Sequence, residues 1–164
     1  MTTSLPRVAH EHHERLMKHI EEMPTVGRMI LSAPIEELRP ALLEVEGWLT
    51  GLLLPHMEAA ERSIYPELER MLQNRHSMTP MRREHAEIRR LVGEFSKLVG
   101  GLGDHRPPIG TVVLLRRVLY SLYALLEIHL VEEEEYVRII DHQIDERAAE
   151  MLAAAFSHAT ILEG

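Results

Sequence analysis

Apolar residues recur at helical spacing along most of the 164-residue chain, and this periodicity constrains the fold more than any other feature. Side chains three, four and seven residues apart share one face of a helix, whereas a strand would need strict alternation. Such alternation is almost absent. Leu, Ala, Glu, Arg and Met, which all favour helices, dominate the composition, and aromatic residues make up only 4% of it. The sequence therefore predicts an all-α fold.

Proline, glycine and capping residues divide the chain into four long helices and a short one. We expect these helices at residues 4–24, from residues 32–34 onward with a bend at Pro55, at 79–100, at 109–141 and, for the short one, at 146–159. Four long helices with short connections indicate an up-down four-helix bundle with a short C-terminal helix. A chain of this length is expected to form one domain, residues 1–164.

Composition excludes several classes of function. The chain has 18 Lys and Arg against 26 Asp and Glu, a net charge of −8, which argues against nucleic acid and anionic membranes as partners. Because it has no cysteine, disulfides, thiolate zinc sites, iron–sulfur clusters and cysteine nucleophiles are excluded. The first residues do not resemble a secretory signal, and the longest near-apolar stretch, residues 118–126, is too short to span a membrane. We therefore expect a cytoplasmic protein.

Four of the eleven histidines form an internal repeat, with one in each predicted long helix: His13, His56, His85 and His129. The first pair is 43 residues apart and the second pair 44. Each histidine lies on the same stripe as the apolar residues of its helix, so all four are expected to converge on the bundle axis. A single histidine on such a stripe is more often a packing residue. Four in register favour a metal site, because a cation offsets the cost of burying them.

The carboxylates near these histidines indicate the kind of metal site. Glu133 follows His129 by four residues, about 40° further round the helix, so both side chains can reach one ion. The other glutamates of the 132–135 run point elsewhere and form a solvated face. Histidine and carboxylate ligands without thiolate suit iron, manganese or zinc. Paired histidine helices with bridging glutamates are typical of dinuclear carboxylate centres.

In the first half of the repeat, the position equivalent to that bridging glutamate is Ala60. Glu58 and Glu61 point about 200° and 140° away from His56 in a regular helix, so neither shares its face. A π-bulge downstream of Pro55 would rotate Glu61 inward, and such bulges are frequent at functional sites. Glu61 is therefore a sixth candidate ligand.

Several motifs together carry a family resemblance: Glu11-His-His-Glu-Arg-Leu16, Leu53-Leu-Pro-His56, Ile64-Tyr-Pro66, Glu84-His85, Leu125-Leu-Glu-Ile-His129 and Glu132-Glu-Glu-Glu-Tyr136. With them, nearly the whole chain resembles the hemerythrin-like proteins of the HHE cation-binding family. The family pattern H…HxxxE…H…HxxxE is matched by His13, His56, His85, His129 and Glu133. The resemblance implies a non-haem centre of two iron ions, joined by an oxo or hydroxo bridge, in a four-helix bundle. It also implies O₂, nitric oxide or peroxide as the small reactant.

Two departures from the family pattern bear on the chemistry. Since Ala60 replaces the first bridging glutamate, the centre has one carboxylate bridge, borrows Glu61 or Glu58, or binds a single metal. Met81 stands four residues before His85, where the oxygen carriers of the wider family have a further histidine. Open coordination positions admit reactants, so peroxide or nitric oxide chemistry is favoured over reversible O₂ carriage.

Within the first motif, two neighbouring histidines compete for one ligand position. His12 is the rival to His13, but Leu16 and Ile20 fall at the expected offsets, three and seven residues, only from His13, as Ile88 and Val92 do from His85. His10, three residues before His13, is a candidate either for orienting a ligand imidazole or for a surface position.

The leading hypothesis is a cytoplasmic non-haem iron protein that reacts with O₂, nitric oxide or peroxide, with zinc or manganese as alternative metals. One alternative is a metal buffer or a redox or gas sensor without turnover, so the sequence leaves open whether the protein is an enzyme. Another is a degenerate bundle with a lost or mononuclear site. No nucleic acid or membrane partner is expected, and the protein is expected to be a monomer or a small homo-oligomer.

Overall fold

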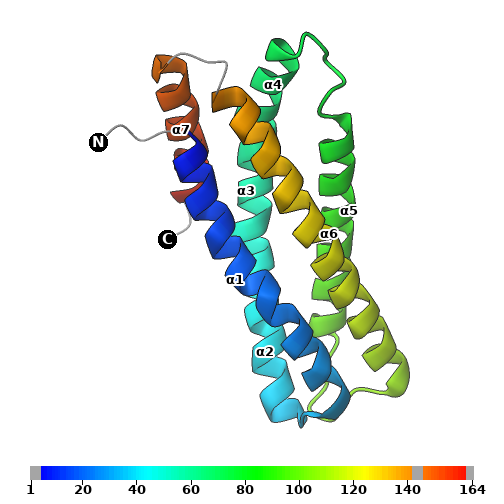
Figure 1. The fold of residues 1–164 in the computed structure, drawn as a ribbon. Helices are drawn as coiled ribbons and strands as arrows, with labels where there is room; N and C mark the ends of the chain where they lie inside the picture. The colour runs from blue at the N-terminus through cyan, green and yellow to red at the C-terminus, as the bar shows by residue number, and fades with distance from the viewer. Residues whose placement is uncertain (1–4, 142–145, 162–164) are drawn as a thin grey trace.

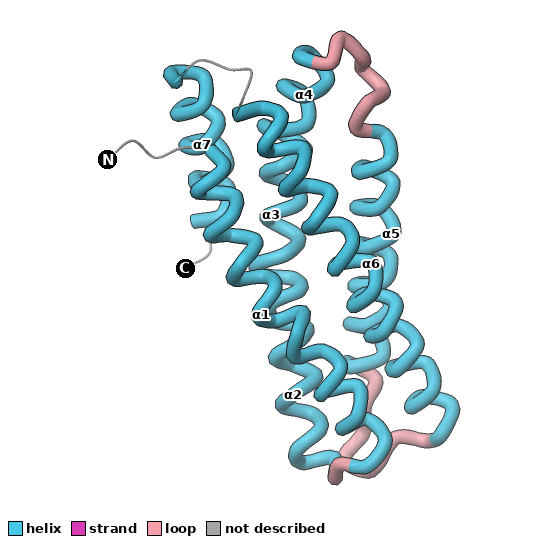
Figure 2. Tube along the Cα trace, in the orientation of Figure 1, coloured by secondary structure: helices cyan, strands magenta, loops and turns pink. Residues whose placement is uncertain are grey.

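The computed structural model describes residues 5–141 and 146–161, and it is helical there apart from short connections (Figure 2). No strand occurs in these residues, so the all-α prediction is confirmed for them. The elements are α1 (Leu5–Ser32), α2 (Ile35–Trp48), η1 (Leu49–Leu53), α3 (Leu54–Ala59), η2 (Ala60–Ile64), α4 (Tyr65–Met71), α5 (Thr79–Gly100), α6 (Ile109–Asp141) and α7 (Glu146–Ile161). The two η elements are π-helical turns.

The segment from α2 to α4 forms one nearly continuous helical column, and α1, α5 and α6 lie beside it (Figure 1). α1 packs against α6 and α2, and α5 packs against α6 and α2. α7 covers α1, α3 and η2. Short connections at residues 33–34, 72–78 and 101–108 join the long elements. The observed bounds of α5, α6 and the start of α7 agree closely with those expected from the sequence.

The first helix is longer than expected. α1 continues through Pro24 to Ser32, so the prediction that it ends at Pro24 was wrong. Met23, Val26 and Ile30 are all buried in the main core, which shows that the apolar stripe continues beyond the proline. A proline inside a helix removes one backbone hydrogen bond, but packing of an amphipathic face supplies most helical stability in proteins. Here that packing outweighs the proline.

The helical column contains two π turns, and each ends two residues before a proline, Pro55 after η1 and Pro66 after η2. The Leu54 N–H donates to the Leu49 carbonyl, and the Tyr65 N–H donates to the Ala60 carbonyl, five residues back in both cases. A proline at the next position offers no N–H and crowds the carbonyl four residues before it. Widening the preceding turn relieves that crowding by placing one extra residue in it. A π turn downstream of Pro55, the feature that would rotate Glu61 inward, is thus present, as η2.

The core consists of two apolar clusters. The larger one lies among α1, α2, η1, α5 and α6, and the smaller one joins η2, α4, the start of α5, the end of α6 and α7. Where they meet, the structure buries six polar side chains, which are all the buried polar ones among the residues it describes: His12, His13, His56, His85, His129 and Glu133. Burying such a layer costs free energy unless each polar group has a hydrogen-bonding or ionic partner. The layer therefore marks a candidate functional site.

Helix α6 is long and apolar enough to cross a membrane by length and composition alone. The same test is passed by core helices, and α6 packs against α1 and α5 while carrying buried His129 and Glu133. Because a core helix that packs in this way passes the same test, the apolar character of α6 is only weak evidence of a membrane span.

Candidate metal centre

The four repeated histidines and Glu133 come together at one place in the core. His13 comes from α1, His56 from α3, His85 from α5, and His129 and Glu133 from α6. None of the five is more than 3% exposed. Their donor atoms form two groups, His13–His56–Glu133 and His85–His129–Glu133, and within each group the atoms lie within 4.8 Å of one another. The single carboxylate shared by both groups joins the two halves of the histidine repeat.

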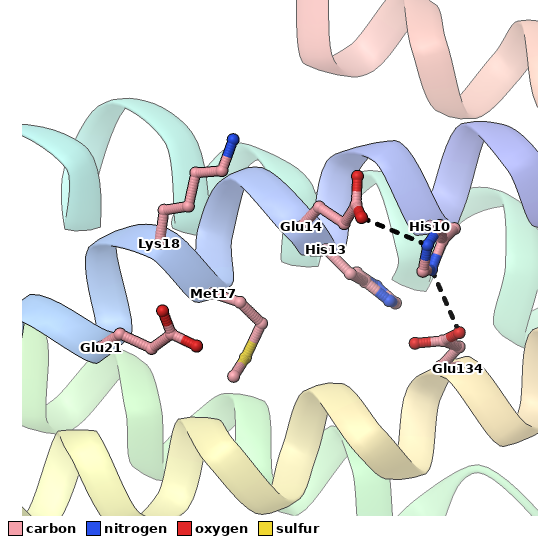
Figure 3. A pocket seen from close by; sticks show the side chains of 7 residues that line it. All are labelled: His10, His13, Glu14, Met17, Lys18, Glu21 and Glu134. Carbon is pink, nitrogen blue, oxygen red and sulfur yellow. Dashed lines mark hydrogen bonds and ion pairs between the residues drawn. The ribbon is translucent and has the colours of Figure 1, made fainter.

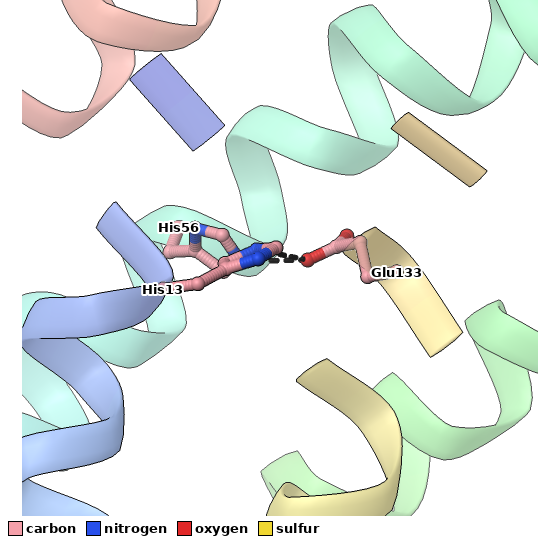
Figure 4. Close-up of side chains that lie close together, drawn as sticks. All are labelled: His13, His56 and Glu133. Atoms are coloured by element: carbon pink, nitrogen blue, oxygen red, sulfur yellow. Dashed lines mark hydrogen bonds and ion pairs between the residues drawn. The ribbon is translucent and has the colours of Figure 1, made fainter. Parts of the chain in front are cut away.

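In the first group, two imidazoles meet one carboxylate oxygen (Figure 4). Oε2 of Glu133 lies 3.2 Å from Nε2 of His13 and 2.8 Å from Nε2 of His56. Burial opposes the charged form of Glu133, but the facing histidines, His56 first among them, hold the pKa of this carboxyl well below its usual range. Burial lowers the pKa of His56, although Glu133 acts in the opposite direction. The group therefore presents an ionised carboxylate and an imidazole that burial keeps neutral.

In the second group, two imidazoles face each other. Nε2 of His85 lies 3.0 Å from Nε2 of His129. On the outer edges of the rings, Nδ1 of His85 lies 2.7 Å from Glu61 and Nδ1 of His129 lies 2.8 Å from Glu84. A carboxylate accepts hydrogen bonds, so each Nδ1 carries the proton and each Nε2 presents a lone pair. Histidines that bind metals are held by carboxylates in this way.

Two lone pairs that face each other across 3.0 Å repel unless a cation or an additional proton lies near them. An additional proton is disfavoured, because burial and the neighbouring His129 lower the pKa of His85 to about 4. Neutral imidazole is the form that binds a metal. The donor set of this group thus fits a metal ion better than it fits a structural hydrogen bond.

Glu61, expected from the sequence as a possible ligand, lies at the outer edge of His85. Its Oε1 accepts a hydrogen bond from Nη1 of Arg89 at 3.0 Å in addition to the contact with His85. Burial favours a higher pKa for Glu61, but Arg89 and His85 outweigh this effect and lower the pKa. The π turn η2 does bring Glu61 toward the site, yet neither donor group includes it. The other candidate, Glu58, is exposed and pairs with Arg62 at 3.2 Å.

Tyr65 belongs to the centre, although its residue type and spacing did not indicate this. Its hydroxyl donates to Oε1 of Glu133 at 2.8 Å and lies 3.1 Å from Nε2 of His85. Burial, reinforced by Glu133, raises the pKa of the phenol far above its usual value, so the hydroxyl stays protonated. In a regular helix Tyr65 would point about 180° away from His56. The extra residue in η2 reduces that angle to about 80°, so only a recognised π turn would have revealed Tyr65.

The two histidines next to His13 in this part of α1, His12 and His10, lie in different environments. His12 is buried, and its ring stacks on His56 with centroids 5.2 Å apart. Burial, together with nearby His56, lowers the pKa of His12 to about 3. His12 belongs to neither donor group, whereas His13 does. His10 is exposed and lies 3.3 Å from Glu134, so it has the surface position.

A surface pocket opens beside the first group, between α1 and α6 (Figure 3). Its volume is about 330 Å³, and its wall consists of His10, His13, Glu14, Met17, Lys18, Glu21 and Glu134. Because His13 belongs both to the pocket wall and to the first donor group, the pocket reaches the edge of the centre. Small molecules therefore have a short approach to it from solvent.

Comparisons with known proteins agree with this geometry. No curated protein and no solved structure matches the chain. The family model described as the hemerythrin HHE cation binding domain matches residues 4–137, a range that contains all four repeated histidines as well as Glu133. The match covers more than half of the chain and includes both donor groups. The chain therefore belongs to the hemerythrin HHE cation-binding family.

Proposed function

We propose that the protein binds two iron ions, one in each donor group, within an up-down four-helix bundle, and that this centre reacts with O₂, nitric oxide or peroxide. The observation that carries the proposal is the facing pair of Nε2 atoms on His85 and His129, whose outer nitrogens are held by Glu61 and Glu84. Because a cation is the simplest group that satisfies both lone pairs, a metal at this position is favoured. Glu133, common to both groups, supports a second ion beside the first.

The residues divide into those that hold a metal and those that orient them. His13, His56, His85 and His129 would be terminal ligands, and Glu133 would bridge. Glu61 and Glu84 hold the rings of His85 and His129 through Nδ1. When bound, iron supplies one-electron and oxygen chemistry that no side chain of this cysteine-free protein provides.

Tyr65 takes a role that a second bridging glutamate at position 60 would otherwise have. Ala60 is fully buried and contributes no ligand atom, while the Tyr65 hydroxyl donates to Glu133. The phenol keeps its proton, so it can fix the orientation of the carboxylate. Because it has one O–H, it can donate to a reactant near His85 only by releasing Glu133. Replacing one carboxylate by a neutral hydroxyl leaves fewer anionic ligands and favours open coordination positions.

The pocket beside His13 indicates which reactants can approach. Its wall carries the carboxylates of Glu14, Glu21 and Glu134 against the single ammonium of Lys18. This balance disfavours anions and admits small neutral molecules. Dioxygen, nitric oxide and hydrogen peroxide are all small and uncharged, in keeping with the proposal.

Elemental analysis of the purified protein tests the metal. We expect about two iron atoms per chain if both groups are filled as metal sites sharing one carboxylate. The double variant His56→Ala, His129→Ala should lose the iron, whereas His105→Ala, which changes an exposed histidine in a connection, should keep it. Absence of any transition metal in the wild type, or an unchanged content in the double variant, would contradict the proposal.

Kinetics then separate an enzyme from a sensor. Consumption of peroxide or nitric oxide in proportion to the iron content supports a catalytic oxidoreductase. A change in the iron spectrum on mixing, without turnover, supports a sensor or a metal buffer that uses the same ligands.

A further inference from the structure

The outer face of α6 carries an unusual amount of exposed apolar surface. Five large apolar side chains on this one helix are between 42% and 77% exposed: Ile109, Val113, Leu114, Ile128 and Val131. The other exposed large apolar residues that the structure describes are divided among α1, α2, the 72–78 connection and α7. α1 and α5 pack against other faces of α6, and α7 packs on α1 and α3. Concentrated exposed apolar surface of this kind marks an interaction site.

Within this face, seven exposed residues form a narrow band, which we call the α6 stripe: Val113, Arg117, Ser121, Ala124, Ile128, Val131 and Glu135. At 100° per residue they fall within an arc of about 80°, and the band is about 33 Å long. Its two ends carry opposite charges, and its middle carries two small residues. These properties decide which partner the stripe fits.

We propose that the α6 stripe binds the α6 stripe of a second copy of this chain, with the two helices antiparallel about a two-fold axis. In the register that places Ala124 opposite Ile128 of the second copy, Ser121 lies opposite Val131. Ile128 and Val131, at the middle of the band, each meet a small residue, which allows the helices to approach closely there. A two-fold axis repeats every such contact, because the interface is self-complementary.

The same register pairs the opposite charges. Arg117 lies opposite Glu135 of the second copy, and the symmetry axis repeats this pair. A parallel arrangement would instead place Arg117 opposite Arg117, and like charges that face each other are unfavourable. Within one chain, the exposed Arg117 contacts Glu94, and the exposed Glu135 lies 3.3 Å from Arg138. Exposed ion pairs of this kind contribute little, so both side chains can turn to a partner at small cost.

Charge also distinguishes a second copy from a lipid surface. An apolar helix face that lies on a membrane is normally flanked by Lys and Arg, which attract anionic headgroups. The α6 stripe carries only one basic residue, Arg117, against Glu135 at its other end, and the chain carries a net charge of −8. The complementary ends and the large-against-small pairing instead fit a copy of the same helix.

Sedimentation equilibrium of the full chain tests the proposal. We expect a dimer in the wild type, and Ile128→Asp, which places two charges in the symmetric interface, should raise its dissociation constant at least about 100-fold. The matched control is Leu43→Asp, which changes a 49% exposed leucine on α2 and should leave the dimer unchanged. Helical circular dichroism and metal content report on folding of each variant independently, since the α6 stripe lies outside the donor groups.

Charge reversal provides a second and more specific test, of the proposed Arg117–Glu135 pairs. Arg117→Glu and Glu135→Arg should each weaken the dimer about 10-fold or more, because every copy then has like charges opposed. The double variant restores both pairs and should return to within a few-fold of the wild-type dissociation constant. A monomeric wild type at all concentrations, a dimer insensitive to Ile128→Asp, additive losses in the double variant, or stripe-dependent binding of the monomer to anionic vesicles would each overturn the proposal.

Discussion

At the scale of single residues, the outer nitrogens of the histidines are the most informative atoms of the centre. A histidine that merely packs in a core needs one hydrogen bond, and either nitrogen can make it. Here His85 and His129 both use Nδ1, each with its own carboxylate, and both direct Nε2 to the same point. The two carboxylates therefore set the tautomers and the aim of the rings.

Replacing these carboxylates tests that role. Glu84→Gln and Glu61→Gln should each weaken metal binding about 10- to 100-fold while leaving the number of ions bound at saturation unchanged. Titration of the metal-free protein with the metal, followed by calorimetry, measures both quantities. Glu87→Gln is the control, since Glu87 lies on the same helix but forms an exposed pair with Arg90. Loss of one ion in Glu61→Gln would instead make Glu61 a direct ligand.

Tyr65 provides a second test at the residue scale. Tyr65→Phe removes the hydroxyl that donates to the buried, ionised Glu133, so the free energy of unfolding of the metal-free protein should fall by about 1.5–3 kcal/mol. Tyr123→Phe is a close match, because the Tyr123 hydroxyl also donates to a glutamate, at 2.7 Å, but at the edge of the molecule. Its effect should stay within about 0.5 kcal/mol. Urea denaturation measures the free energy of unfolding of both variants. Equal decreases would show that the Tyr65 hydroxyl stabilises the fold no more than the Tyr123 hydroxyl does.

The sequence was sufficient to predict the four histidines and Glu133 as neighbours, because all five lie on the apolar stripes of their helices. It was not sufficient for Tyr65 or for the outer position of Glu61, since Glu61 lies within the π turn η2 and Tyr65 follows it. The sequence also did not predict the carboxylates that contact Nδ1 of His85 and His129. Glu84 faces His129 across two helices, and no spacing along one helix indicates such a pair.

At the scale of elements, α1 and α6 are in close contact where a glycine meets an aromatic ring. A Cβ atom added to Gly27 would lie 2.7 Å from the Tyr120 hydroxyl oxygen and 2.8 Å from the ring carbon beside it. The Gly27 carbonyl also accepts a hydrogen bond from Arg116 at 2.9 Å. This contact fixes the distance between the two helices in the part of α1 beyond Pro24.

Gly27→Ala should therefore destabilise the protein by about 1–3 kcal/mol through overpacking, in spite of the higher helix propensity of alanine. Gly93→Ala is the control within α5, since nothing lies within 4 Å of an added Cβ atom there. That substitution should raise the free energy of unfolding by up to about 1 kcal/mol. Thermal denaturation of the two variants measures both changes in stability, which are expected to have opposite signs. A stabilising Gly27→Ala would mean that Tyr120 moves aside freely.

The elements most accurately predicted were α5 and α6, which have a clear capping or loop signal at each end. The error at Pro24 has a plain physical cause. A proline rule considers one lost hydrogen bond, whereas the continuing stripe of Met23, Val26 and Ile30 adds several buried side chains. The two π turns show the opposite case, because Pro55 and Pro66 did change the local backbone from α-helical to π-helical.

At the scale of the whole molecule, a bound metal should stabilise the fold. A cation that binds only the folded state at 1,000 times its dissociation constant adds about 4 kcal/mol to the free energy of unfolding. Removal of the metal with a chelator should accordingly lower the melting temperature of the wild type. It should not change that of the His56→Ala, His129→Ala variant. A chelator without effect on the wild type would favour a degenerate bundle with structural histidines.

The division of the core into two clusters has a consequence for how the molecule opens. The centre lies at their junction, and among the residues whose side chains are described the smaller cluster, around Ile64, Leu68 and Met81, buries fewer apolar side chains than the larger one. Local opening starts where apolar burial is lowest, in units that behave as separate foldons. Without metal, amide hydrogens in α4 and the first turns of α5 should exchange faster, while those in the middle of α6 stay protected. A metal bound at the centre would thus couple the smaller, less stable cluster to the larger one. The supply of metal would then set how often the smaller cluster opens.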